Sequence, residues 1–279
     1  MDLNQYGSFF SIFILKILRL IIIKLQYFCR LIFMTMRYFI EFSYNGKNYF
    51  GYQIQPEAIS VQEELEKALS TILRENIKTT GAGRTDTGVH ARKMFAHFDT
   101  EQPVDENLSR RLNSFLPPDI SIKRIFPVKH DFHARFDATF RTYEYYISLE
   151  KNPFTEESAW QHWRKPLDVD KMSEACTILF EYEDFTSFAK LHTDNKTNLC
   201  KIYKAEWEQD GSELKFTVSA NRFLRNMVRA IVGTLVEVGT GKLKPEEVRR
   251  VIEDRHRNSA GTSAPAHGLY LVDVGYDFD

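Results

Sequence analysis

A glycine-rich string between two strand-like stretches constrains this chain more than any other feature. Residues 81–91 read GAGRTDTGVHA, with three glycines and a single carboxylate, that of Asp86, among the first eight residues. Glycine is favoured where the backbone turns with a positive φ or comes close to another group. The string therefore predicts a tight loop that presents Asp86. Arg84, two residues earlier, is expected to keep this carboxylate ionised and to orient it.

The string alone does not define an active site. Gly, Asp and Thr are ordinary turn residues, and an Asx-turn between two strands uses the same residues. The string also lacks the Gly-Lys-Ser/Thr ending of a phosphate-binding P-loop, and no acidic residue follows at the spacing of a dinucleotide-binding motif. By itself it is more typical of a turn without function than of a catalytic loop.

The periodicity of the flanking sequence predicts an α+β fold. Residues 38–44 alternate as a strand and end in the turn signal Asn45-Gly46, and Ser60 with Glu63 forms a capping box before a helix at 61–73. Residues 77–80 lead into the glycine-rich string, and 93–98 leave it as a strand. A helix at 104–116, stopped by Pro117-Pro118, and a strand at 120–127 follow. This order is typical of a ferredoxin-like split βαβ unit.

A second unit of similar plan follows. Strands are expected at 142–149, 202–208, 214–220 and 269–276, and helices at 169–180, 223–238 and 245–252, with Asp168 as a candidate cap. We therefore predict two ferredoxin-like (RRM-like) α/β sandwich units with a largely antiparallel sheet. The expected domains are residues 36–140, which carry the glycine-rich loop, and residues 141–279.

Residues 1–35 differ in kind from the rest. Residues 9–34 are a run of Phe, Ile and Leu interrupted by basic side chains, and no uncharged stretch reaches the roughly 18 residues of a transmembrane helix. A signal-peptide cleavage site is also lacking. Because Met34 and Met36 directly precede the first strand, we interpret this leader as upstream sequence joined by an early start codon, outside the fold. An amphipathic membrane-surface helix is the alternative.

Charge and cysteine content restrict the partners and the compartment. The net charge of −1 does not indicate nucleic-acid binding, so an RNA partner would need a local basic surface. The cysteines, Cys29, Cys176 and Cys200, have neither zinc-site nor disulfide-framework spacing, which favours the reducing cytoplasm.

Two further segments carry candidate functional side chains. In the strand after residue 141, Tyr143 and Tyr145 share one face, and an aromatic ring in a cleft can stack on a nucleobase, although core packing is the commoner role. Helical spacing after residue 221 brings Arg222, Arg225 and Arg229 near one another. Arg229 has apolar neighbours and is expected to pair with an anion such as Asp86 or a substrate phosphate.

These segments together resemble one protein family. The strings GRTDTGVH (residues 83–90), HARF followed by RTYEY (133–145) and MVRAIVG (227–233) stand in the order found in the tRNA pseudouridine synthase A family. The similarity runs from about Met36 to the C-terminus. Thr87 stands where alanine is usual and Tyr52 where tryptophan is common, and neither change removes a group that the reaction needs.

The resemblance implies an enzyme. Asp86 would be the catalytic nucleophile or base, with Arg84 and Arg229 around it and Tyr143 in the uracil pocket. The implied protein is a homodimer that converts uridine to pseudouridine at positions 38 to 40 of tRNA, in the anticodon stem-loop. The isomerisation exchanges no electrons or groups, so no cofactor and no metal are expected.

Phosphate contacts are expected from Arg222 and Arg225, and more loosely from Lys242, Lys244, Arg249 and Arg250. Two other functions fit parts of the sequence. A non-catalytic RNA-binding protein of RRM-like fold would use similar aromatic and arginine side chains. An aspartate-based phosphoryl-transfer enzyme would need further carboxylates for Mg²⁺ near Asp86, and the segment offers none.

Overall fold

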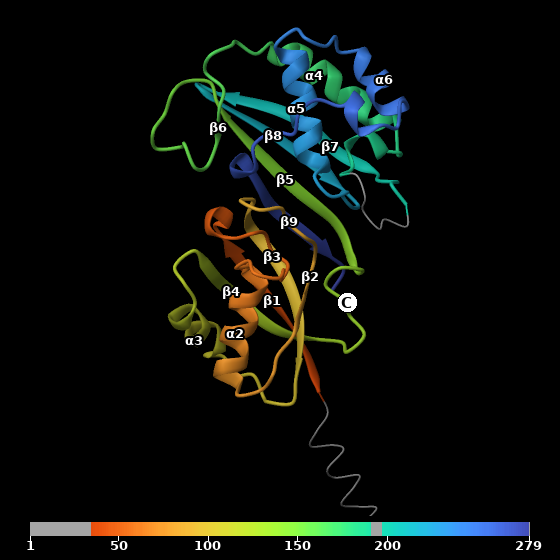
Figure 1. Cartoon of the computed structure of the whole chain (residues 1–279). Helices are drawn as coiled ribbons and strands as arrows, with labels where there is room; N and C mark the ends of the chain where they lie inside the picture. Colours follow the sequence, from red (N-terminus) through yellow and green to blue (C-terminus); the bar gives the residue numbers. More distant parts are fainter. Residues whose placement is uncertain (1–34, 191–196, 279) are drawn as a thin grey trace, which may run out of the picture.

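One mixed sheet runs through the whole molecule (Figure 1). The computed structural model describes residues 35–190 and 197–278, so the interpretation of the leader lies outside the described residues, apart from Thr35. The strand order is β4-β1-β3-β9-β5-β8-β7, with β2 beside β3 and β6 beside β5. Its strands are β1 (Met36–Tyr44), β2 (Thr79–Gly81), β3 (His90–Thr100), β4 (Ile120–Val128), β5 (Ala138–Ser148), β6 (Trp160–Gln161), β7 (Ile202–Asp210), β8 (Glu213–Ala220) and β9 (Leu269–Tyr276).

Strand pairing confirms the predicted fold class. All neighbours along the path are antiparallel except β3 and β9, which run parallel with His90 opposite Tyr270 and Ala91 opposite Leu271. The last strand of the chain thus lies between the two halves. It pairs with β3 on one side and with β5 on the other.

Each half has its own helices and core. Helices α2 (Val61–Leu73) and α3 (Leu108–Phe115) lie over the strands of the N-terminal half, and α4 (Val169–Ile178), α5 (Met227–Gly239) and α6 (Glu247–Glu253) lie with those of the C-terminal half (Figure 1). The cores cross the expected division, because Leu271 and Val274 of β9 belong to the N-terminal core, and Val89 belongs to the C-terminal core. The division into domains after residue 140 stays a prediction.

Most predicted elements are present, with shifted ends. The helix predicted at 104–116 starts only at Leu108, and the one predicted at 169–180 ends at Ile178 and continues as the 3-10 turn Leu179–Glu181. Asn45-Gly46 leads into a 3-10 turn, Gly46–Asn48, rather than into a hairpin. The prediction that a helix begins at Phe223 was wrong. The helix α5 begins at Met227 because Asn226 adopts a left-handed backbone, with a φ of 67°, which a continuous helix excludes.

Both predicted helix caps that involve side-chain oxygens are confirmed. The Ser60 hydroxyl accepts a hydrogen bond from the Glu63 backbone N–H, and the Asp168 carboxylate accepts one from the Lys171 N–H. In the part of the chain that the structure describes, no helix is long and apolar enough to cross a bilayer.

We predict that Ser60→Ala lowers the free energy of unfolding by about 0.5–2 kcal/mol, because the first turn of α2 loses its buried cap. The matched control is Asn107→Ala, since Asn107 precedes α3 without a side-chain capping bond and should cost less than about 0.5 kcal/mol. Urea unfolding of both variants measures the difference. Equal losses would contradict the role of the Ser60 cap.

Candidate active site

The loop of residues 82–89 is fixed from several sides. The Ala82 N–H donates to the Phe95 carbonyl, and the hydroxyls of Tyr44 and Thr85 share a hydrogen bond of 2.9 Å. A Cβ added at Gly51, which has a φ of 92°, would lie 2.4 Å from the Thr85 carbonyl oxygen. The loop therefore packs directly against the backbone that precedes α2, and this close packing limits how far Asp86 can move.

Gly88 confirms the predicted role of glycine in one part of the loop. Its φ is 78°, in the region that favours glycine, and its N–H donates to the Tyr49 carbonyl. The Val89 N–H then donates to the Asp86 carbonyl, which closes a tight turn. This turn presents the Asp86 side chain, whose exposed fraction is 22%.

Two guanidinium groups face the Asp86 carboxylate. Arg229 Nη1 lies 3.4 Å from Oδ2, and Arg225 Nε lies 3.7 Å from Oδ1. Both contacts are longer than the usual charge-assisted hydrogen bond of about 2.7–2.9 Å. The carboxylate is therefore compensated in charge, while its oxygens keep lone pairs that are not tightly engaged.

Arg229 is the more firmly held of the two. It lies in the first turn of α5, its Nε donates to the Ala264 carbonyl at 2.7 Å, and its side chain is 21% exposed. The predicted pairing of Arg229 with Asp86 is thus confirmed. The cause is the one expected from sequence, since a guanidinium among apolar neighbours needs an anion.

Arg225 and Arg222 lie on the connection between β8 and α5 and not on the helix. The Asn226 side chain donates to Ser263 Oγ at 2.7 Å and holds this connection. Arg225 is half-exposed, and Arg222 is partly buried and forms no ion pair with a described residue. Arg225 and Arg229 therefore both lie near Asp86 because the chain bends before the helix, and not because of helical periodicity.

Arg84 does not pair with Asp86, although its position two residues earlier in the sequence predicts that it would. Its side chain is exposed and forms no ion pair with Asp86 or with any other described residue. The expectation that it orients the carboxylate is not met, and Arg225 and Arg229 supply the cations instead. Its guanidinium is left at the surface beside the loop.

Tyr143 lies on β5 between the two cores. Its ring meets the Phe223 ring edge to face, with the centroids 5.2 Å apart and the planes at 90°. Burial raises the pKa of its phenol to about 12, with Arg141 opposing the shift and the Asp86 carboxylate adding to it. Tyr143 and Asp86 therefore share one electrostatic environment, and the phenol is protonated at neutral pH.

Arg141 is a site residue to which the sequence assigned no role. Its two terminal nitrogens donate to four backbone carbonyls, those of Ala82, Arg135, Ala138 and Asn221, at 2.6–2.9 Å. These bonds join the start of the loop of residues 82–89 to the connection that carries Arg222 and Arg225. The alternation of the strand was an available signal, because it places Arg141 on the inward face with Tyr143 and Tyr145.

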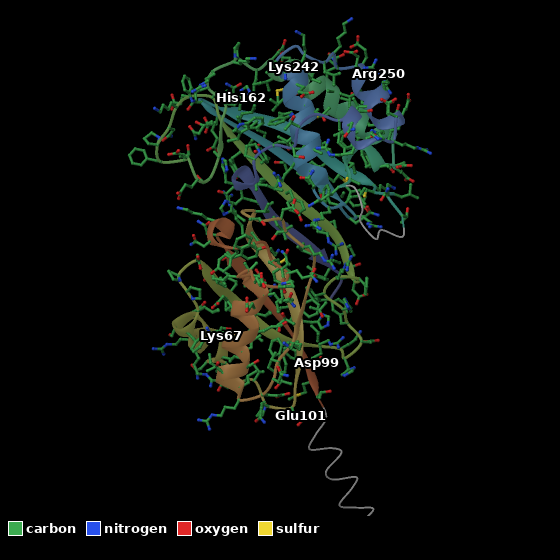
Figure 2. The ribbon with its side chains drawn as sticks, in the orientation of Figure 1. Lys67, Asp99, Glu101, His162, Lys242 and Arg250 are labelled. Atoms are coloured by element: carbon green, nitrogen blue, oxygen red, sulfur yellow. The ribbon has the colours of Figure 1, made fainter. Side chains whose placement is uncertain are left out.

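The remaining predicted phosphate ligands lie elsewhere. Lys242 and Lys244 follow the C-terminal end of α5, which lies about 15 Å along the helix from Arg229. Figure 2 shows Lys242 and Arg250 at the outer end of the C-terminal helices. Arg249 pairs with Glu181, and Arg250 and Lys242 have acidic neighbours. Among the described residues, no group of three or more His, Cys, Asp or Glu side chains could hold a metal ion.

Together, the fold and the site place a single carboxylate, that of Asp86, beside two arginines and in the electrostatic environment of Tyr143. A family model described as tRNA pseudouridine synthase matches residues 41–137 and 182–277, and the chain belongs to this family. The resemblance seen in sequence is thereby confirmed.

Curated relatives match almost over their whole length. The chain is 56% identical over 245 residues to the tRNA pseudouridine synthase A of Bacteroides fragilis, an alignment that covers 87% of this chain and 97% of the relative. It is 54% identical over 242 residues to the protein of that name from Parabacteroides distasonis, with 86% and 96% covered. Identity to that of Francisella tularensis subsp. novicida is 43% over 244 residues, with 86% and 93% covered.

We predict that Arg141→Met lowers the free energy of unfolding by about 1–3 kcal/mol, because partly buried carbonyls lose their donors. Arg84→Met is the matched control and should change it by less than about 0.5 kcal/mol, since Arg84 is exposed and without an ion pair. Guanidinium chloride unfolding of both proteins gives the comparison. If the two variants lose the same stability, Arg141 does not tie the loops together.

Proposed function

We propose that this chain isomerises uridine to pseudouridine in tRNA, with Asp86 as the catalytic residue. The observation that carries the proposal is the placement of Asp86, which is held between Arg225 and Arg229 on a fixed loop in the electrostatic environment of Tyr143. The curated relatives bear the name of a tRNA pseudouridine synthase, which supports the same reaction.

The chemistry needs one carboxylate. The N1–C1′ glycosidic bond breaks, the uracil turns, and C5 bonds to C1′, after which C5 loses its proton and N1 gains one. Asp86 either attacks the sugar as a nucleophile or removes a sugar proton as a base. Both roles need free lone pairs on the carboxylate oxygens, and the long contacts to the two arginines leave them available.

Tyr143 is proposed to hold the detached uracil. Its ring is fixed by Phe223, so it offers a flat surface to a planar base without losing further side-chain freedom. Because the pKa of its phenol is about 12, the hydroxyl can take the C5 proton only if it passes its own proton on.

Arginines around the loop are proposed to contact the RNA. The target base must leave its stack, which costs a few kcal/mol, and phosphate contacts offset this cost. Arg84 and Arg222 are suited to such contacts because neither forms an ion pair with a described residue. Arg225 is suited as well, since it is half-exposed and only weakly engaged by Asp86.

The finer features rest on the family resemblance. We propose that the substrate uridines are those at positions 38, 39 and 40 in the anticodon stem-loop, and that two chains form a homodimer. We also propose a cytoplasmic location, since Cys176 and Cys200 are buried free thiols, as is usual in a reducing compartment.

We predict that Asp86→Asn lowers the rate of pseudouridine formation by about 10³-fold or more, because the amide is neither a nucleophile nor a base. Affinity for tRNA should change little. Tritium release from C5-labelled uridine in tRNA measures the rate, and filter binding measures the affinity. The control is Asp105→Asn, which removes a carboxylate from an exposed ion pair with Arg111. Normal isomerisation by Asp86→Asn would contradict the catalytic role of Asp86, whereas no isomerisation by the unchanged protein would support the non-catalytic RNA-binding function.

The proposed homodimer predicts that the protein scatters light with the mass of two chains at micromolar concentration. Multi-angle light scattering after gel filtration measures this mass. A mass of one chain over the whole concentration range used for catalysis would exclude the dimer and leave the catalytic proposal standing.

A further inference from the structure

The loop that follows β4 holds an unusually exposed aromatic ring. The Phe136 side chain is 74% exposed, and the His133 ring lies against it with the centroids 4.3 Å apart and the planes at 34°. The Arg135 guanidinium lies 5.7 Å from the centre of the same ring. One side of the phenyl ring is therefore backed by an imidazole and flanked by a cation, while most of its surface meets solvent.

Hydrogen bonds hold the loop that carries the exposed Phe136 ring. His133 Nδ1 accepts hydrogen bonds from the backbone N–H groups of Arg135 and Phe136, and the His133 N–H donates to Asp137 at 2.6 Å. The Ala134 N–H donates to His97, and its carbonyl accepts from Tyr276 at 2.5 Å. The backbone that carries Phe136 is thus fixed on all sides, so the ring is held out into water.

The loop also adjoins the catalytic loop. Arg141 Nη2 donates both to the Arg135 carbonyl, at 2.6 Å, and to the Ala82 carbonyl, at 2.9 Å. The two loops therefore lie within two hydrogen-bond lengths of each other at this point. The charges of Arg135 and Arg222 both act on Arg141, so both guanidinium groups lie near it.

Single exposed apolar side chains are common and need no explanation. Phe136 differs because hydrogen bonds hold its backbone, because a second aromatic ring backs it, and because the Arg135 guanidinium beside it forms no ion pair with a described residue. Arg84 and Arg222, on the segments that Arg141 joins to this loop, likewise form no ion pair with a described residue. An unpaired cation beside a flat ring matches a polyanion that carries planar groups, namely an unpaired stretch of RNA.

We propose that Phe136 is a stacking platform for an unpaired base of the substrate RNA next to the flipped-out uridine, with His133 as its backing and Arg135 toward the adjoining phosphate. This inference rests on the proposed function and deepens it, since it specifies which residues bind the RNA beside the reacting nucleotide. The base that stacks on Phe136 loses its neighbour when the uridine flips, and the ring replaces that lost stacking.

The test compares substitutions that keep or remove the aromatic face. Dissociation constants for an unmodified tRNA transcript are measured by filter binding at several salt concentrations, and kcat and KM by tritium release. We expect Phe136→Ala and Phe136→Leu to weaken binding by about 5- to 100-fold, the range for one stacked base. Phe136→Trp should restore binding to within about threefold, and the salt slope should not change, because no phosphate contact is lost.

Phe115→Ala is the matched control, since Phe115 is 45% exposed at the end of α3, over the edge strand β4, and should leave tRNA binding unchanged. Equal binding by Phe136→Leu and Phe136→Trp would overturn the stacking role in favour of plain apolar packing. If Phe136→Ala changed the mass in light scattering but left the affinity for tRNA unaltered, a second copy of the chain would cover the ring. That result would also overturn the stacking role. If Phe136→Ala binds normally while pseudouridine still forms, only this inference fails.

Discussion

The insertion of β9 between β3 and β5 is the constraint on which the rest of the structure depends. The last strand of the chain pairs in parallel with the beginning of β3 and antiparallel with β5, so the backbone groups that each half would leave unpaired are satisfied. Neighbouring strands lie about 4.8 Å apart, which sets β3 and β5 roughly 10 Å from each other. β3 follows the loop of Asp86 and β5 carries Tyr143, so this pairing sets the strands next to these two residues on opposite sides of β9.

Asp86 illustrates how charge balance and availability can coexist. The N-terminal half supplies the carboxylate, and the C-terminal half supplies both guanidinium groups, that of Arg225 from the connection before α5 and that of Arg229 from the first turn of α5. Because Arg229 is already bonded to the Ala264 carbonyl, it is held by the protein and not by the carboxylate. The charge of the carboxylate is thus compensated while its oxygens stay available, which suits the nucleophile or base that we propose Asp86 to be.

Arg141 stabilises the backbone near Asp86 by donating hydrogen bonds to its carbonyls. A partly buried guanidinium is costly when it has no hydrogen-bond partners, and here four carbonyls from three separate segments satisfy it. Burial lowers the pKa of this arginine from its usual value, with nearby arginines adding to the effect. The same side chain thereby joins the loop of residues 82–89, the loop of Phe136 and the connection that carries Arg225.

The sequence by itself determined the local structure and the identity of the central residues. Ser60 and Asp168 signalled helix starts because capping depends on a side chain and its next few backbone groups. Asp86, Tyr143 and Arg229 stood out because a lone carboxylate on a glycine loop, an alternating aromatic strand and an arginine among apolar residues are all short-range patterns.

Only the tertiary structure decided which cations meet Asp86 and how the halves join. Arg84 is near Asp86 in sequence but forms no ion pair with it, whereas Arg225 and Arg229, which do, come from some 140 residues further along the chain. The left-handed backbone at Asn226 and the four-carbonyl role of Arg141 depend on partners from distant segments. Such contacts are set by packing and strand pairing between elements, and no local pattern of residues records them.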